Sequence, residues 1–166
     1  MKKISLILVL TLIFAFTLIS CSDKSEDGAE WKTSDYSPAS KAEALTALPA
    51  LADTTVFTAN ENPLDEDFEY YFGDAAVFEG VEDYVFFTSK KANVAEAGIF
   101  KCKDKATAEA LLNAFATRRE NLSETFKLYS VEDTNIALNM SKGSFDDVVW
   151  FVTTKDNKSV EDVITK

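Results

Sequence analysis

Residues 84–103 read YVFFTSKKANVAEAGIFKCK, and this stretch decides the fold that the sequence predicts. Residues 84–88 are all aromatic or β-branched, which is the composition of a strand. Residues 89–93 have the polar composition of a turn, and residues 95–103 form a second strand. Because so short a connection joins strands that lie side by side, we predict an antiparallel hairpin.

The hairpin leads into the longest predicted helix, over about residues 105–128. Asp104 is a suitable N-cap for this helix. The apolar residues after it recur at helical spacing on one stripe, whereas charged residues such as Lys105 and Glu109 lie largely outside it. The stripe consists of Ala108, Leu111, Leu112, Phe115, Leu122 and Phe126. We therefore expect one face of this helix to pack in the core.

A second hairpin and a last helix are predicted near the C-terminus. Residues 135–141 and 147–154 are expected to pair across a turn at residues 142–144. The last helix starts at Asp156 or Ser159, either of which can act as its N-cap, and carries its valines and isoleucine inward.

Two shorter helices are predicted before the first hairpin. Ser37-Pro38 and Asn62-Pro63 each combine a capping residue with a proline at the first helical position. Pro49 breaks or kinks the first helix, and Gly73 ends the second. The order of elements predicts one α+β domain over residues 37–166. It has two layers: an antiparallel sheet of two hairpins flanking a long central helix, with helices packed on the sheet.

Two predicted strands are apolar on both alternating faces, which is unusual for an antiparallel sheet with one side in water. This holds for residues 84–87 and for residues 148–152. Something must therefore cover part of the second face. Either the N-terminal helices cover it, or it binds a partner or an apolar ligand. For the second alternative, the candidate binding face consists of Tyr84, Phe86 and Trp150.

The N-terminus has the pattern of an export signal. Lys2 and Lys3 precede 16 residues, 4–19, that are almost all apolar, which is shorter than the roughly 20 residues of a membrane-spanning helix. Residues 18–21, Leu-Ile-Ser-Cys, resemble a lipobox. That resemblance implies cleavage between Ser20 and Cys21 and lipidation of Cys21. It predicts a signal peptide over residues 1–20 and a lipid anchor on the extracellular face of the cell membrane, the alternative being an uncleaved anchor helix.

The chain after the signal peptide is strongly acidic. The whole chain carries a charge of −11 and the signal peptide removes two lysines, which leaves −13. Such a charge argues against nucleic acid as a partner and against electrostatic docking on anionic lipid. Residues 21–36 are predicted to be the lipidated cysteine followed by a flexible polar tether.

No pattern in the sequence predicts catalysis, a metal site or a cofactor. There is no histidine, and after lipidation of Cys21 only Cys102 remains, which we expect to be a small buried residue. The acidic cluster at residues 65–69 resembles a calcium loop only superficially, because Tyr70 stands where that loop needs glycine. Other carboxylates, at 74, 79, 82, 83, 146 and 147, show no spacing that singles out an acid/base pair. We therefore expect a protein that is not an enzyme.

From about residue 71 onward the chain resembles a family of uncharacterised lipoproteins of Gram-positive Firmicutes, built on a small domain of unknown function. The similarity lies in residues 82–85, 95–104, 118–119, 126–129 and 142–145. The resemblance implies the same fold and membrane anchor and adds no catalytic residue. We expect a non-enzymatic envelope binding or interaction module that contacts an unknown envelope protein or small ligand. The alternative is a lipoprotein that captures a solute or metal, and a carboxylate-based cell-wall hydrolase ranks last.

Overall fold

The hairpin predicted from residues 84–103 forms the centre of the sheet. β2 (Val81–Ser89) pairs antiparallel with β3 (Glu96–Cys102), and Tyr84 lies opposite Phe100. In the part of the chain that the structure describes, five strands follow the order β1-β2-β3-β5-β4, and all neighbours are antiparallel. The predicted α+β class with an antiparallel sheet is therefore confirmed.

The structure is a computed structural model of the 166-residue chain, and it describes residues 31–61, 66–73 and 75–166. Residues from Trp31 to Lys166 form one compact unit. The predicted signal peptide, the cleavage site and Cys21 lie outside the described residues. So do residues 62–65, which contain the predicted cap of the second helix and the start of the acidic cluster.

The second hairpin exists, but its first strand was predicted in the wrong place. β4 (Ser141–Phe145) pairs with β5 (Val148–Thr153), so the predicted turn at residues 142–144 lies inside a strand. Residues 135–138 belong to a helix, α4 (Val131–Leu138). The observed turn falls at Asp146, which adopts a positive φ of 46°.

A fifth strand in the sheet, β1, was not predicted. β1 (Thr54–Thr58) pairs antiparallel with β2 and lies at the edge of the sheet. Its pairing places Val56 opposite Phe87. Its partner β2 begins only at Val81, so the position of β1 depends on a strand that comes later in the sequence.

One face of the sheet is covered by α2 (Glu66–Phe72), a 3-10 helix η3 (Ala75–Phe78) and α3 (Lys105–Phe126). Asp104 caps α3 as predicted, because its carboxylate accepts a hydrogen bond of 2.9 Å from the Thr107 N–H. Gly73 ends α2 with a φ of 82°, a conformation that side chains disfavour. The core on this face is largely aromatic.

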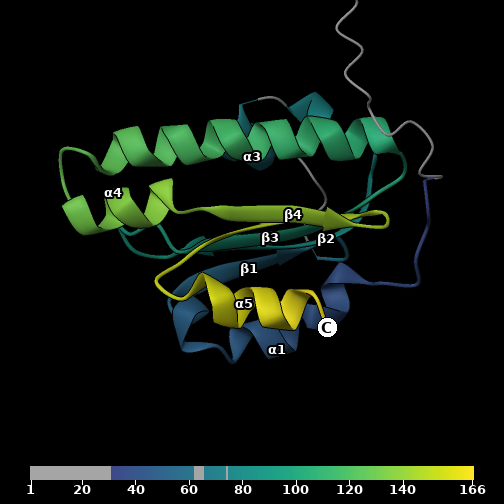
Figure 1. Cartoon of the computed structure of the whole chain (residues 1–166), viewed down its shortest axis with the longest axis horizontal. Helices are drawn as coiled ribbons and strands as arrows, with labels where there is room; N and C mark the ends of the chain where they lie inside the picture. Colours follow the sequence, from purple (N-terminus) through teal and green to yellow (C-terminus); the bar gives the residue numbers. More distant parts are fainter. Residues whose placement is uncertain (1–30, 62–65, 74) are drawn as a thin grey trace, which may run out of the picture. The chain divides into compact units, whose positions relative to one another are not determined.

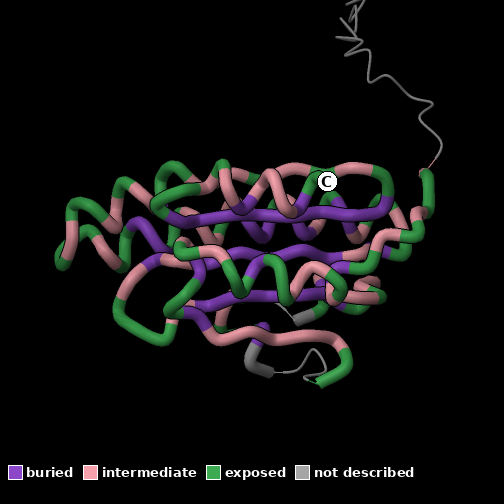
Figure 2. The backbone as a smooth tube through the Cα atoms, turned by 90° about the horizontal axis from the view of Figure 1, so that it is seen from below, coloured by how far each residue is buried: buried purple, intermediate pink, exposed green. Residues whose placement is uncertain are grey.

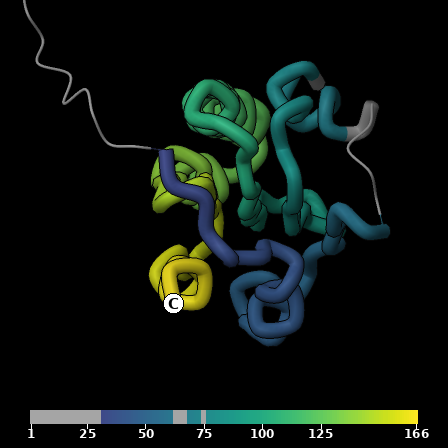
Figure 3. Tube along the Cα trace, turned by 90° about the vertical axis from the view of Figure 1, so that its right-hand side faces the viewer, coloured from purple at the N-terminus to yellow at the C-terminus, as the bar shows by residue number. Residues whose placement is uncertain are grey.

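The other face is covered by helices from both ends of the domain. The 3-10 helices η1 (Pro38–Lys41) and η2 (Pro49–Leu51) flank α1 (Ala42–Thr46), and α5 (Asn157–Ile164) lies beside them. The sheet is thus the middle of three layers, as the side and end views show (Figures 1 and 3). The prediction of two layers is corrected.

Two cores fill the spaces between these layers, and the three central strands β2, β3 and β5 are buried along most of their length (Figure 2). The α3-side core includes Phe68, Phe72, Tyr84, Phe86, Phe100, Leu111, Phe115 and Phe151. The α5-side core includes Leu45, Leu51, Val85, Phe87, Ile99, Trp150, Val152, Val160 and Ile164. Apolar residues on both faces of β2 and β5 therefore have the helical cover that their pattern required.

Candidate functional site

The predicted binding face of Tyr84, Phe86 and Trp150 is not available at the surface. Tyr84 and Phe86 are at most 1% exposed and belong to the α3-side core, and Trp150 is 9% exposed in the α5-side core. This prediction is wrong because helices cover both faces of the sheet. The alternative interpretation, cover by helices, is the one that the structure supports.

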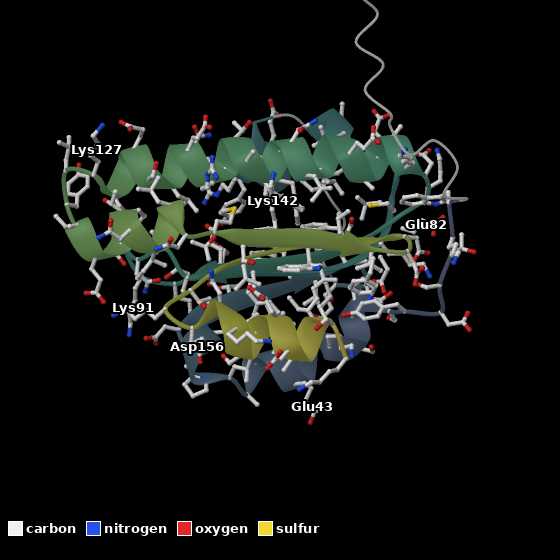
Figure 4. The ribbon with its side chains drawn as sticks, in the orientation of Figure 1. Glu43, Glu82, Lys91, Lys127, Lys142 and Asp156 are labelled. Carbon is white, nitrogen blue, oxygen red and sulfur yellow. The ribbon has the colours of Figure 1, made fainter. Side chains whose placement is uncertain are left out.

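A pocket lies at the end of the domain where α3 is joined to α4. Its volume is about 640 Å³, within the range of small-molecule and peptide pockets. It is lined by Leu48, Pro49, Ala50, Asp53, Asn93, Val94, Ala95, Glu132, Asp133, Ile136, Thr154, Lys155, Asp156 and Ser159. We call this region the pocket end. Figure 4 places Asp156, Lys91 and Lys127 at this end and Glu82 at the opposite one.

Residues 93–95, between β2 and β3, belong to the pocket lining, and we call them the floor of the pocket. Val94 is buried with Leu122 of α3 and Ala137 of α4. The Asn93 side-chain oxygen accepts a hydrogen bond of 2.9 Å from the Ala95 N–H. These contacts connect the β2–β3 turn to the two helices above it, so the floor is part of the folded core.

Glu96, the residue after Ala95 of the pocket lining, forms a buried ion pair with Arg118. The Glu96 carboxylate accepts two hydrogen bonds from the Arg118 guanidinium, at 3.0 and 2.5 Å, and both side chains are at most 13% exposed. The guanidinium also lies over the Tyr71 ring, at 5.3 Å from its centroid. A two-point contact of this kind fixes both position and orientation. It ties α3 to the first residue of β3, next to Ala95.

The rim of the pocket carries charged side chains. Two carboxylates form exposed ion pairs, Asp53 with Lys91 at 2.8 Å and Glu132 with Lys155 at 2.7 Å. The hydrogen bond and charge of Lys155 lower the pKa of Glu132, and the same contact raises the pKa of Lys155. Among the described residues, no lysine or arginine forms an ion pair with Asp133, which is half-buried.

Two helices begin at the wall of the pocket, and both are capped by side chains. The Ser130 hydroxyl accepts a hydrogen bond of 3.0 Å from the Asp133 N–H at the start of α4. At the start of α5, Asp156 accepts one of 3.2 Å from the Ser159 N–H. The cap at Asp156 was one of the two predicted, whereas α4 and its cap were missed. Ser130 followed three residues later by Asp133 was the available signal.

The opposite end of the domain is closed by a hydrogen-bonded clasp of Ser34, Lys101 and Asp147. The Asp147 carboxylate is fully buried and accepts hydrogen bonds from the Ser34 N–H at 3.0 Å and its hydroxyl at 2.5 Å. The Lys101 ammonium donates to the Ser34 carbonyl at 2.6 Å and lies 3.7 Å from the carboxylate. We call this region the clasp end.

The clasp makes residues 31–36 part of the domain. Trp31 packs against the α3-side core, and Tyr36 packs against the α5-side core with its hydroxyl donating to the Ile164 carbonyl at 2.9 Å. The segment thus crosses one end of the sheet from one core to the other. The predicted flexible tether over residues 21–36 is corrected for residues 31–36, and the domain starts at Trp31 instead of residue 37.

The remaining candidates for chemistry have structural surroundings. Cys102 is buried, and burial together with the nearby carboxylates of Asp147, Asp104 and Glu82 raises the pKa of its thiol to about 12. The thiol is therefore protonated and a poor nucleophile. Within the described ranges, no three metal-ligating side chains come together. Of the acidic cluster at residues 65–69, residue 65 and the side chains of residues 66 and 67 lie outside the described residues.

Together these features define a small α+β domain with helices on both faces of an antiparallel sheet and an acidic pocket at one end. The family of the domain of unknown function DUF4358 matches residues 62–154, and the chain belongs to this family. No curated protein and no solved structure matches the chain. The matched region contains the pocket floor and α4, but η2, Lys155 and α5 lie outside it. None of the helices in the described part is long and apolar enough to cross a membrane.

Proposed function

We propose that the protein is a lipoprotein of the Gram-positive cell surface, anchored through Cys21, that works as a non-enzymatic binding module. The lipobox-like residues 18–21 support the anchor. The pocket supports the binding role, because it is concave, partly apolar and bordered by several polar groups. The pocket is the observation that carries this proposal, since the predicted binding face of Tyr84, Phe86 and Trp150 is buried.

The layout of the domain suits a module held at one end and free at the other. The chain enters the described fold at Trp31, at the clasp end (Figure 1). The pocket lies at the opposite end of the domain, toward the C-terminus of α3, which is a helix of 22 residues and hence about 33 Å long. On our proposal, the lipid anchor on Cys21 is joined through the chain to the clasp end of the domain, and the pocket is at the other end.

The anchor is tested with the full chain expressed in a Gram-positive host. Metabolic labelling with a fatty acid should label the protein, and Cys21→Ser should abolish the label. The Cys21→Ser variant should also no longer be found as the processed, membrane-bound form, and it should appear as uncleaved or soluble protein instead. Cys102→Ser is the matched control and should be labelled normally, because the thiol is buried. Equal labelling of the Cys21→Ser variant would refute the anchor.

The binding site is tested by filling the pocket. Ala95 lines it and is half-buried, so Ala95→Phe should occupy the space that a ligand needs. Ala92→Phe is the matched control, because Ala92 is exposed in the same turn and does not line the pocket. Photo-crosslinking on intact cells should yield adducts with the wild type and the Ala92→Phe variant that are lost in Ala95→Phe. Unchanged adducts in Ala95→Phe would refute the pocket as the working site.

A further inference from the structure

We infer that the pocket binds a basic peptide segment of a partner protein, with an arginine or lysine side chain lying against the acidic rim. This inference rests on the proposed binding function and specifies its ligand. The lining contains four carboxylates and one lysine, an excess of three negative charges around a partly apolar floor. A long basic side chain has the complementary form, because it combines an apolar stem with a cationic head.

The rim carboxylates remain open to a ligand. Asp133 has no ion-pair partner among the described residues, and the Glu132–Lys155 pair is exposed, at 68% and 72% of its side chains. Exposed pairs contribute little to stability. An incoming cation can therefore exchange with Lys155 at small cost, whereas the buried pair of Glu96 and Arg118 stays closed.

The two helices that begin at the pocket do not make it an anion site. A helix N-terminus attracts anions through its free N–H groups and its dipole. Here the Asp133 and Ser159 N–H groups already donate to Ser130 and Asp156. The carboxylates of Asp133 and Asp156 also stand at these termini, so the negative charge that the dipoles favour is supplied by the protein itself.

A peptide is favoured over a small free amine by the surface beside the pocket. Leu128, Tyr129 and Val131, at the junction of α3 and α4, are 86%, 83% and 77% exposed. Val131 is the residue before Glu132 of the rim, so this exposed apolar surface lies at the same end of the domain as the pocket. An extended partner can contact both regions, whereas a small amine reaches only the pocket.

The test uses the full chain purified in detergent and a fluorescein-labelled peptide of alternating arginine and leucine, with binding followed by fluorescence anisotropy. A second peptide has glutamine in place of arginine. The wild type should bind the arginine peptide at least about tenfold more tightly than the glutamine peptide, and added salt should weaken this preference. Equal affinity for the two peptides, or no binding of either, would overturn the inference.

Charge-matched variants separate the pocket from the overall negative charge. Asp133→Asn/Asp156→Asn removes two rim charges, and asparagine still caps α5. Glu43→Gln/Glu161→Gln removes the same charge from positions outside the pocket lining. We expect the rim variant to lose about tenfold in affinity for the arginine peptide and the control to lose less than about twofold. Equal losses would show attraction to net charge alone and would refute the site.

Two further arms distinguish the possible failures. Spermidine is the small-amine competitor. If it binds the wild type as tightly as the arginine peptide does and loses affinity in the rim variant, the ligand is a small amine and the peptide inference is overturned. If the arginine peptide fails but the cellular adducts are still lost in Ala95→Phe, the cationic ligand is refuted and the binding function stands. If Ala95→Phe changes neither the adducts nor peptide binding, the proposed function itself fails.

Discussion

The two ends of the sheet use the same chemical groups for different purposes. At the clasp end, the Asp147 carboxylate is fully buried and takes its hydrogen bonds from Ser34, with Lys101 close by. At the pocket end, the buried Glu96 pairs with Arg118, whereas a rim carboxylate such as Glu132 is exposed. Burial, and not residue type, therefore decides whether a charge stabilises the fold or remains free to bind.

The physical reason is the cost of removing a charge from water. A buried carboxylate is tolerated only when donors replace its water, and removing one partner then leaves the other charge uncompensated. An exposed pair keeps most of its hydration and gains little from its partner. Substitutions of buried and of exposed carboxylates should therefore differ in their effect on stability.

The largest effect is expected for Glu96→Gln. The amide cannot match the two charge-assisted hydrogen bonds that the carboxylate accepts, and Arg118 is left as a buried unpaired cation. We expect a loss of about 4 kcal/mol in the free energy of unfolding, measured by urea denaturation of the segment from Trp31 to Lys166. The matched control is Glu132→Gln at the same end, which should leave the urea midpoint almost unchanged. Similar losses in both variants would remove the distinction between buried and exposed carboxylates.

A slightly smaller effect is expected for Asp147→Asn at the clasp end. The side chain keeps its size and can still accept one hydrogen bond from Ser34, but Lys101 loses its counter-ion. The free energy of unfolding should fall by about 3 kcal/mol. Proteolysis should then cut near residues 31–36 earlier than elsewhere, as judged by mass spectrometry. Asp146→Asn, in the exposed position next to it, is the control, and a loss of the same size there would argue against the clasp.

A third variant, Ser130→Ala, addresses the wall of the pocket. It removes the hydrogen bond that caps α4, and caps of this kind contribute about 1 kcal/mol. We expect faster hydrogen exchange in α4 with little change in α3. Ser37→Ala is a suitable comparison, because Ser37 stands at the N-cap position of η1 without capping it and donates to Asp83 instead. An α4 that exchanges no faster in Ser130→Ala would show that packing alone holds this wall.

The smallest effect concerns alkaline pH and the clasp end. Burial raises the pKa of Tyr36 from 10.0 to about 12 and contributes to the raised pKa of Cys102. The unfolded chain therefore loses these protons at lower pH than the folded domain, so this contribution to stability is present below about pH 9 and is lost as the pH rises toward 12. The urea midpoint should fall over that interval. Tyr36→Phe should show a shallower fall, and an identical slope would exclude Tyr36 as a source.

The predictable part of the fold consists of elements whose signals are local. The first hairpin, α3 and α5 lie close to the predicted ranges, because strand composition, helical spacing and capping residues act within a few positions. The acidic caps at Asp104 and Asp156 were readable for the same reason. The need for cover on the second face also followed from residues 84–87 and 148–152 alone.

The missed parts depend on partners that are distant along the chain. Residues 135–138 are a short apolar run, for which helix and strand are hard to tell apart. They are helical in the structure, where Ala137 packs against Val94 and Leu122. The strand β1 was overlooked because its partner in the described sheet, β2, begins at Val81. The exposed aromatic face was wrongly predicted because no local signal shows which helix covers which strand.

The sequence by itself determined the class of the domain, its central hairpin, its long helix and the expected anchor at Cys21. Only the tertiary structure decided the pocket, because its lining comes from η2, the β2–β3 turn, α4 and the start of α5, which are adjacent only after folding. It also decided that Asp147 is a structural charge while Asp133 faces the pocket. Local patterns follow from the backbone and from neighbouring residues, whereas burial and the distances between charges depend on how distant segments pack together.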